Sequence, residues 1–256
     1  MRVLTINLNG VRAAHAKGLA VHLADQRADV ICMQEVRARE AQVPAALTPP
    51  GHGGYWHGAE KAGYSGVGIY SRVTPLGVLR GLNVANFDVE GRVLRLEYPG
   101  LSVESVYVPS GTSSPERQAF KMSFLEEFLR HAAGLAASGR EVLLCGDFNI
   151  AHTRLDLKNW RANQDYSGFL PEERAWVDEL IAVGFVDVQR RLLGPEGISY
   201  TWWSNRGRAR DLDVGWRIDY QLATPGLAAT ATAASVYRDA YFSDHAPLAV
   251  DYDWPL

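Results

Sequence analysis

Val142-Leu143-Leu144-Cys145-Gly146-Asp147-Phe148-Asn149 is the stretch around which the rest of the chain is organised. Its four leading apolar residues predict a strand that is covered on both faces, because the run is too short for a globular helix. Gly146 ends the run, and since side chains alternate along a strand, Asp147 and Asn149 should point the same way at its mouth. A carboxylate beside a carboxamide can hold a water molecule or a phosphate oxygen, although Gly, Asp and Asn are also ordinary turn formers.

The composition indicates a chain with a large core. With 256 residues, 47% of them hydrophobic, it can form one large domain or two small ones. The net charge of −3 creates no global field, so any site for a polyanion must be local. Cys32 and Cys145 each lie in an apolar, strand-like run, which favours buried thiols over a disulfide or a metal pair.

The first residues run straight into a strand pattern without signal-peptide architecture. No apolar stretch approaches the roughly 18 residues that a membrane span needs. We therefore expect a cytoplasmic protein that has no membrane partner.

Strand and helix patterns alternate along the chain. Residues 3–7 and 29–35 predict buried strands, and residues 14–26 between them predict one amphipathic helix. From 51 to 108, short apolar runs broken by Gly and Pro predict an antiparallel meander. Ser114-Pro115, a capping hydroxyl before a proline, starts a helix with a wide apolar face.

A polar loop from 151 to 170, a helix from about 172 to 183 and a second series of short strands follow the central strand. No linker, low-complexity run or charge block divides the chain. These patterns predict two sheets packed face to face with helices outside, in a single domain over residues 1–256.

Polar side chains gather at the predicted strand ends: Asn7, Glu35, Tyr107, Asp147, Asn149, Asp219, Asp244 and His245. Hard divalent cations such as Mg²⁺ bind through one or two carboxylates and keep waters for substrate phosphates, a role that suits Glu35 with Asn7 or Asp147 nearby. His245, preceded by an acid, can act as a base or a cation near pH 7. A partly buried Asp219 needs a partner, and a histidine can supply one.

Simpler interpretations exist for each of these residues alone. Glu35 can be a solvated strand end, Asp244-His245 a cap or turn, and Tyr107 a core residue. The tryptophans near the C-terminus would ordinarily be packing, but arginines are interleaved with them. Rings and guanidinium groups in one short segment suit a phosphate backbone and an unstacked or missing base.

The motifs follow one another in a fixed order: Asn7-Leu8-Asn9-Gly10-Val11-Arg12-Ala13, Gln34-Glu35, Gly63-Tyr64-Ser65-Gly66-Val67, Tyr107-Val108-Pro109, Gly146-Asp147-Phe148-Asn149, Gly168-Phe169-Leu170-Pro171-Glu172-Glu173-Arg174, Gly215-Trp216-Arg217-Ile218-Asp219-Tyr220 and Ser243-Asp244-His245-Ala246-Pro247. From first strand to last, the chain resembles the bacterial branch of the exonuclease III family of apurinic/apyrimidinic endonucleases. Asp-x-Asn and Ser-Asp-His alone would fit only the wider endonuclease/exonuclease/phosphatase superfamily. The Tyr-Ser-Gly-Val and Gly-Trp-Arg-Ile-Asp motifs point to its DNA-repair members.

The resemblance implies an α/β fold, a four-layered α/β sandwich in which helices flank two packed mixed β-sheets, as in deoxyribonuclease I. It implies a monomeric nuclease that uses Mg²⁺ or Mn²⁺ and acts on double-stranded DNA with abasic sites or blocked 3′ ends. Such an enzyme hydrolyses the phosphodiester 5′ to the abasic site and acts on 3′ ends as an exonuclease and a phosphatase.

Residue roles also follow from the resemblance. Glu35 is the main metal ligand, with Asn7 beside it and Asp244 as an outer acid. Asp147 activates or aligns the attacking water, and Asn149 positions phosphate or water. Asp219 orients His245, and Tyr107 stabilises the phosphate or the leaving oxygen; Asp147 and His245 both remain candidates for the proton acceptor. The implied DNA-binding residues are Lys61, Tyr64, Arg206, Arg208, Arg210 and Arg217, and the implied abasic pocket consists of Trp202, Trp203, Trp216 and Ile218.

Three positions depart from the family pattern: Asp213 stands where Asn is common, Asn205 replaces an aromatic, and Ser110 follows Tyr-x-Pro where Asn or Gln is frequent. They bear on the balance between abasic cleavage, 3′-phosphate removal and exonuclease action. Two alternative functions are a superfamily phosphatase for small or lipid phosphates and a DNA-binding scaffold with an inactive site. The Trp/Arg segment argues against the first, and the intact set of catalytic residue types argues against the second.

Overall fold

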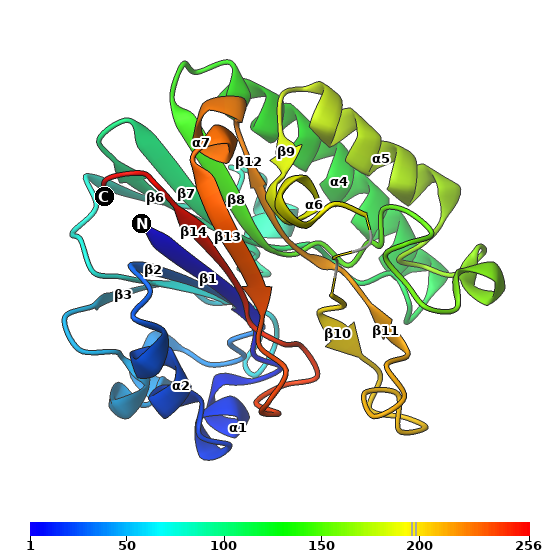
Figure 1. The fold of residues 1–256 in the computed structure, drawn as a ribbon, viewed down its shortest axis with the longest axis horizontal. Coiled ribbons are helices and arrows are strands. Elements are labelled where there is room, and N and C mark those ends of the chain that lie inside the picture. The colour runs from blue at the N-terminus through cyan, green and yellow to red at the C-terminus, as the bar shows by residue number, and fades with distance from the viewer. Residues whose placement is uncertain (196, 198) are drawn as a thin grey trace.

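Two six-stranded β-sheets pack face to face in the computed structural model of the chain, which describes residues 1–195, 197 and 199–256 (Figure 1). The first sheet consists, from edge to edge, of β13 (Ala231–Val236), β14 (Leu248–Tyr252), β1 (Arg2–Asn7), β2 (Val30–Gln34), β4 (Val67–Ser71) and β3 (Gly53–His57). The second consists of β5 (Gly77–Arg80), β6 (Val93–Tyr98), β7 (Leu101–Tyr107), β8 (Glu141–Asp147), β12 (Asp219–Ala223) and β9 (Val186–Asp187). A separate hairpin pairs β10 (Trp202–Trp203) with β11 (Gly215–Trp216).

Side-chain alternation along the strands creates the core. Val3 points between the sheets and packs with Val103 and Leu143 of the second sheet. Leu4 and Ile6 point to the other face of β1, where the first helices cover them. Strands that are buried on both faces therefore read as continuous apolar runs, which is why they could be found in the sequence.

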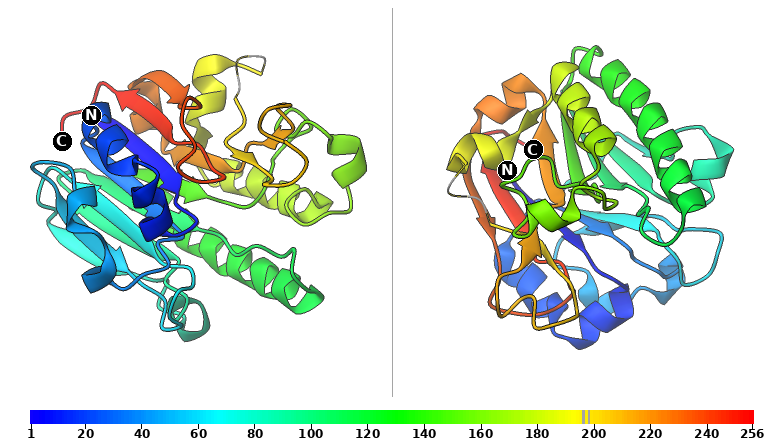
Figure 2. Two further views of the ribbon diagram at one scale, coloured as in Figure 1. Left: turned by 90° about the horizontal axis from the view of Figure 1, so that it is seen from below. Right: turned by 90° about the vertical axis from the view of Figure 1, so that its right-hand side faces the viewer.

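Helices cover the outer face of each sheet, and this confirms the four-layered α/β sandwich. The right-hand view of Figure 2 shows blue helices and green helices on opposite sides of the two sheets. The helices are α1 (Val11–Ala16), α2 (Leu19–Gln26), α3 (Ala85–Asp88), α4 (Pro115–Ala136), α5 (Pro171–Ala182), α6 (Val188–Leu193) and α7 (Pro225–Ala229), with 3₁₀ turns at Glu40–Gln42, Ala45–Leu47 and Trp160–Asn163.

Local sequence signals set several boundaries as expected. The Ser114 hydroxyl accepts a hydrogen bond from the Arg117 amide at 3.3 Å and caps α4, with Pro115 in the first turn. The single helix expected over residues 14–26 is wrong, because Gly18 adopts a left-handed conformation with φ 88° and separates α1 from α2. Cys32 and Cys145 are buried free thiols, as expected.

The region from 51 to 108 forms antiparallel pairs, but not one meander. Strands β3 and β4 belong to the first sheet, whereas β5, β6 and β7 belong to the second. Alternation and turn residues predict hairpins, but they do not say which of two sheets a hairpin joins. Within the described residues, no helix is long and apolar enough to cross a bilayer.

Candidate active site

Strand register brings the predicted polar strand ends to one edge of the sandwich. In the second sheet, Asp147 at the end of β8 lies opposite Tyr107 of the parallel β7 and Asp219 of the antiparallel β12. In the first sheet, Asn7 at the end of β1 pairs with Gln34 at the end of β2, and Glu35 follows directly. Positions that are more than 200 residues apart in the chain therefore share one site.

Asn7 joins the two sheets at this edge. Its fully buried side chain donates through Nδ2 to Glu35 Oε1 at 2.9 Å and to Asp147 Oδ2 at 2.8 Å. Its Oδ1 accepts from the Asn9 amide at 2.9 Å. One amide nitrogen thus fixes the distance between two carboxylates from different sheets.

Asp147 and Asn149 form a compact pair, as their spacing predicted. The Asn149 amide donates to Asp147 Oδ1 at 2.8 Å, and Asn149 Nδ2 donates to Asp147 Oδ2 at 3.2 Å and to the Val108 carbonyl at 2.9 Å. Asn149 adopts φ 51°, a left-handed conformation that Asn tolerates better than most residues. The turn and the site interpretations of this stretch are therefore compatible, because the turn aims the side chains.

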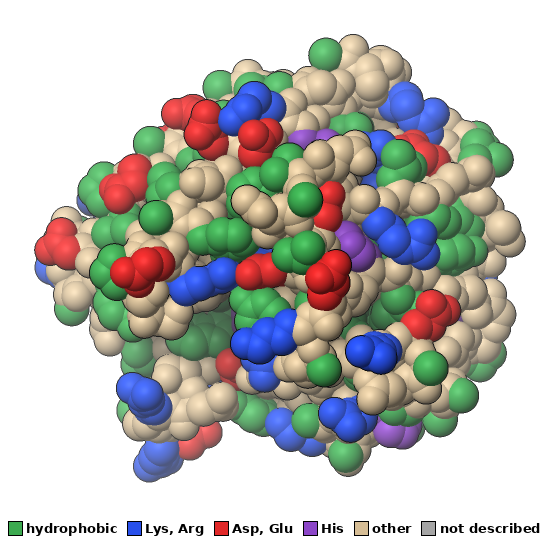
Figure 3. Space-filling view, turned by 180° about the vertical axis from the view of Figure 1, so that it is seen from behind, with side chains coloured by type: hydrophobic (Ala, Val, Ile, Leu, Met, Phe, Trp, Pro, Cys, Tyr) green, Lys and Arg blue, Asp and Glu red, His purple; other side chains and the backbone are tan. Residues whose placement is uncertain are grey.

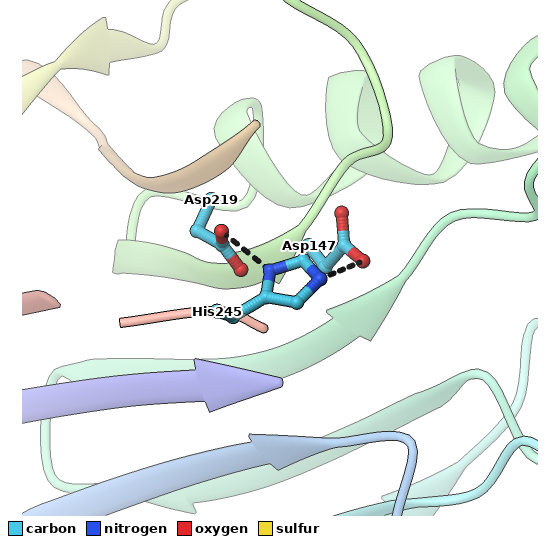
Figure 4. Close-up of side chains that lie close together, drawn as sticks. All are labelled: Asp147, Asp219 and His245. Carbon is cyan, nitrogen blue, oxygen red and sulfur yellow. Dashed lines mark hydrogen bonds and ion pairs between the residues drawn. The ribbon is translucent and has the colours of Figure 1, made fainter. Parts of the chain in front are cut away.

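The His245 imidazole lies between two carboxylates (Figure 4). Its Nδ1 is 2.9 Å from Asp219 Oδ2, and its Nε2 is 3.8 Å from Asp147 Oδ2. Burial alone would lower the pKa of His245, but the charges of Asp219 and Asp147 outweigh burial and raise the pKa to about 10. His245 is therefore an imidazolium at neutral pH.

Burial has the larger effect on the neighbouring acid. It raises the pKa of Asp147 to about 7; the nearby carboxylates of Asp219 and Glu35 add to the rise, and His245 opposes it. Burial and the charge of Glu35 also raise the pKa of Tyr107 well above its ordinary value, so this phenol keeps its proton. The site thus holds an acid that titrates near neutrality between two groups that stay protonated.

The donor set around Glu35 fits a hard divalent cation. Glu35 and Asp147 each place an oxygen within hydrogen-bond distance of Asn7 Nδ2, so two carboxylates, the ligand type that such a cation prefers, lie close together. Asp147, Asp219 and His245 also lie close enough to share an ion, with ligand atoms within 4.8 Å of one another. We favour the Glu35 side, because His245 Nδ1 already bonds Asp219 and is not free to hold an ion.

Asp244 and Arg37 flank this donor set. Asp244 Oδ1 accepts from Asn9 Nδ2 at 2.9 Å, and its Oδ2 accepts from Trp202 Nε1 at 3.1 Å. Arg37 Nε donates to Glu35 Oε2 at 2.9 Å. Glu35 therefore accepts from the Arg37 guanidinium through Oε2 and from the Asn7 side-chain amide through Oε1.

An open cleft of about 840 Å³ is lined by six of the predicted catalytic and metal-binding residues: Glu35, Tyr107, Asp147, Asn149, Asp244 and His245. Its apolar side contains Trp202, Trp216 and Ile218, and the two indole rings meet edge to face with centroids 6.3 Å apart. The prediction that Trp203 also lines the pocket is wrong. Since neighbouring side chains on β10 point to opposite faces, Trp203 is fully buried and its Nε1 bonds Asp213.

The predicted DNA-binding residues divide into three groups. Arg206 lines the cleft, and Arg208 is exposed beside it in an ion pair with Asp211. Lys61 lies 5.3 Å from the Tyr64 ring, and the Tyr64 hydroxyl accepts from Arg92 and Arg117, each at 3.1 Å. Arg210 packs over the Trp203 and Tyr241 rings and donates to the carbonyls of Arg238 and Ala240. The roles of these five residues in DNA binding remain predictions.

For the sixth predicted DNA-binding residue, Arg217, the structure corrects the prediction. Arg217 is fully buried, and its guanidinium bonds Asp156 Oδ1 at 2.6 Å and Asp187 Oδ2 at 2.7 Å. A backbone phosphate could not reach this group, so the prediction that Arg217 contacts DNA is wrong. Its position between Trp216 and Ile218 implied a place at the cleft, but alternation turns its side chain into the protein.

The positions that depart from the family pattern have defined partners. Asp213 accepts from Arg238 Nη2 at 2.6 Å, so a cation offsets the extra acid. Asn205 accepts from the Tyr241 hydroxyl. Ser110 lines the cleft, with its hydroxyl 3.0 Å from that of Thr112.

Sequence reasoning missed several residues of the cleft: Asn9, Arg37, Asn159, Asn163, Tyr166 and Gly168. Asn9 and Arg37 each follow a predicted site residue by two positions, which is a signal that could have been used. Residues 159–168 lie in the polar loop, where no periodic pattern indicates which side chains face a site.

Buried carboxylates beside an imidazolium, with oxygen donors for a cation, suit the hydrolysis of a phosphate ester, so fold and site define a hydrolase. The model of the Endonuclease/Exonuclease/phosphatase family matches residues 4–245. The chain belongs to this family, as a hydrolytic nuclease.

Individual relatives agree with this assignment. The exodeoxyribonuclease of Bacillus subtilis is 38% identical over 249 residues, covering 97% of this chain and 98% of its own. The DNA repair nuclease APEX1 of Danio rerio is 34% identical over 251 residues, covering 97% of this chain and 81% of its own. An AP endonuclease from Archaeoglobus fulgidus superimposes with a TM-score of 0.91 at 28% identity, with 99% of this chain and 100% of that chain covered. A 3′ phosphatase from Neisseria bound to a product DNA hairpin gives a TM-score of 0.91 at 29% identity, with the same coverage.

Proposed function

We propose that this chain is a DNA-repair nuclease that hydrolyses the phosphodiester 5′ to an abasic site in double-stranded DNA and trims blocked 3′ ends, with Mg²⁺ or Mn²⁺ as cofactor. One observation carries the proposal. Glu35, Asp147 and His245 line the same cleft as the apolar surface of Trp202, Trp216 and Ile218, and the buried Asp219 supports His245 from behind. Such a surface can receive a sugar that lacks its base, because the missing base removes both a stacking cost and steric bulk.

The residues divide the work according to their charges. Glu35, with Asn7 and the Asp147 side nearby, would hold the cation, which when bound would polarise the phosphate and offset developing negative charge. His245 as an imidazolium and the protonated Tyr107 supply hydrogen-bond donors for the phosphate oxygens. Asn149 already donates both Nδ2 hydrogens to Asp147 and Val108, so it would position the water through its Oδ1. Asp219 holds the imidazole ring and its proton in place.

The pKa values favour Asp147 over His245 as the proton acceptor. An imidazole with a pKa of about 10 already carries its proton at pH 7 and cannot take a second. A carboxyl whose pKa burial raises to about 7 gains and loses its proton near neutral pH, which suits a general base. In this proposal Asp147 removes the proton from the attacking water.

The test uses a duplex that carries one abasic site, incubated with Mg²⁺, with Mn²⁺ and with a chelator. We expect the protein to nick the duplex only with metal, and Asp147→Ala to lower the single-turnover rate by about 100-fold or more while binding persists. Asp251→Ala is the matched control, because Asp251 pairs with Arg2 at the opposite end of β1. A nicking rate that Asp147→Ala leaves unchanged would remove the proposed mechanism.

The same protein should be offered a 3′-phosphate end, an intact duplex end and a soluble inositol phosphate. Hydrolysis of the inositol phosphate alone would favour a superfamily phosphatase, and binding without any hydrolysis would favour a scaffold. We further propose a cytoplasmic monomer, which cell fractionation and size-exclusion chromatography with light scattering would test.

A further inference from the structure

A buried ion pair lies directly behind the cleft. Lys121 of α4 and Glu173 of α5 both have fully buried side chains, and Lys121 Nζ lies 2.6 Å from Glu173 Oε1. The second partner of Lys121 is the backbone carbonyl of Asn149, at 2.8 Å. The ammonium therefore connects the packed helices to the turn that presents Asn149 and Asp147.

Glu173 makes the corresponding connection to the opposite wall of the cleft. Its Oε2 accepts from the amides of Gly168 at 2.6 Å and Leu170 at 3.1 Å. Its Oε1 also accepts from Gln118 at 3.1 Å. Lys121 thus bonds loop backbone at Asn149, and Glu173 bonds loop backbone at Gly168 as well as the N-cap of its own helix and Gln118 of α4.

The two loops touch each other at Gly168. The Ala151 amide donates to the Gly168 carbonyl at 2.8 Å. A Cβ atom at Gly168 would lie 3.2 Å from the Asn149 carbonyl oxygen and 3.3 Å from the Trp216 ring, and Gly168 has φ 101°. Gly168 therefore fits tightly between the Asn149 backbone and the Trp216 ring.

A role in stability alone does not explain this arrangement. Two charges lose their hydration when they are buried, and an apolar pair of similar volume usually serves a core as well or better. Lys121 lies three, four and seven residues before Phe124, Leu125 and Phe128, on the stripe of α4 where an apolar residue is expected. A lysine at this position is explained if the hydrogen bond from its ammonium to the Asn149 carbonyl has to hold the loop in place.

We infer that Lys121 and Glu173 form a positioning pair, which holds the Asp147–Asn149 turn at a fixed distance from the Gly168–Trp216 wall and so aligns the attacking group with the bound sugar-phosphate. Neither residue contacts the substrate. The inference rests on the proposed function for its kinetic readout.

The test removes both charges at once, so that no lone charge stays buried. In Lys121→Met/Glu173→Gln, the glutamine oxygen can still cap Gly168 and Leu170, but the donor to Asn149 is lost. We expect a folded protein whose affinity for uncleaved abasic DNA stays within about threefold of wild type. Its single-turnover rate should fall by about 10- to 100-fold, because small misplacements of reacting groups slow the chemical step more than binding.

His131→Leu/Glu104→Gln is the matched control, since His131 also lies on α4, its partner Glu104 on β7 is also buried, and the two side chains are 2.8 Å apart. Neither residue lines the cleft. The control should lose comparable thermal stability but keep the wild-type cleavage rate. An unchanged rate in the Lys121/Glu173 variant, or an equal loss in the control, would overturn the inference.

Two further measurements keep the inference testable if that variant does not fold or if wild-type protein does not nick. Gln118→Leu weakens the support of Glu173 while both charges stay, and it should lower the rate severalfold. Amide hydrogen exchange at Gly168 needs no activity and should accelerate in Gln118→Leu; unchanged exchange would contradict the pair's role. Failure of wild type to nick any substrate would count against the proposed function alone.

Discussion

His245 has two carboxylates within reach, and the balance between burial and charge decides its protonation. Burial favours the neutral imidazole, whereas Asp219 at 2.9 Å and Asp147 at 3.8 Å favour the cation. The charges prevail, and the pKa rises to about 10. The same cluster leaves Asp219 Oδ1 without a hydrogen-bond partner among the described side chains, so the interaction is concentrated on one oxygen.

Asp219→Asn should lower the pKa of His245, because Asp219 is the largest of the charges that raise it. The folded pKa of His245 lies above the ordinary value of 6.5, so its contribution to stability is complete below pH 6.5 and is lost as the pH rises through about 10. In chelator, wild-type protein should therefore lose free energy of unfolding over that window, and the variant should lose less. NMR titration of the His245 ring, together with urea unfolding at several pH values, measures both effects. A wild-type ring that titrates near 6.5 would contradict the assignment.

For individual residues, the sequence predicts membership of the site better than it predicts burial and hydrogen-bond partners. Asn7, Glu35, Asp147, Asn149, Asp219 and His245 follow from polar residues at strand ends and from the family motifs. The burial of Arg217 does not follow, because its partners Asp156 and Asp187 are 61 and 30 residues away and no local pattern joins them. The sequence shows Lys121 as a charged residue on an apolar helical stripe, but only the structure identifies its partners, Glu173 and the Asn149 carbonyl.

The β10–β11 hairpin sets the shape of the apolar side of the cleft. Its strands have two residues each, and Trp202 pairs with Trp216 across them. Strands this short leave no alternation to detect, so the sequence suggested the tryptophans as a group without separating Trp203, which faces inward. Longer elements such as α4 and β8 were predictable because their burial pattern extends over several turns or residues.

Gly215→Ala should disturb this hairpin. A Cβ atom at Gly215 would lie 2.5 Å from Trp203 Nε1 and 2.7 Å from Tyr200 Cβ, so the strand must shift. We expect a loss of about 1–3 kcal/mol in the free energy of unfolding from overpacking. The preference for abasic over intact duplex in a binding assay should also fall, since Trp216 follows directly.

Gly134→Ala is the control for this change. Gly134 lies within α4 with open space around its Cα, and the added methyl group should be neutral or stabilising by up to about 1 kcal/mol. Abasic preference should not change. If both variants keep the preference, the hairpin does not determine the shape of the slot.

At the scale of the whole molecule, local surface charge has to provide the attraction for DNA. The net charge is −3, and acidic and basic side chains are interspersed over the face that Figure 3 shows. The fold decides which basic side chains DNA can reach. Arg217 and Lys121 are fully buried, whereas Arg206 and Arg208 are exposed beside the cleft. Counting arginines in the sequence therefore overstates the cations that a phosphate can reach.

Exposed and buried arginines should consequently respond differently to salt. If Arg206 and Arg208 each neutralise one phosphate, Arg206→Ala/Arg208→Ala should reduce the slope of log affinity against log salt by about 1.8, because each duplex contact contributes about 0.9. Arg217→Met should leave that slope unchanged but lower the free energy of unfolding by about 3–5 kcal/mol, because Asp156 and Asp187 lose their buried cation. Arg130→Ala on α4, which removes an exposed guanidinium paired with Glu126, should change neither quantity appreciably. Fluorescence anisotropy with an abasic duplex between about 50 and 200 mM salt, beside urea unfolding, separates the two kinds of arginine. A salt slope that falls with Arg217→Met would mean that this guanidinium reaches the DNA after all, and that the buried ion cluster opens when substrate binds.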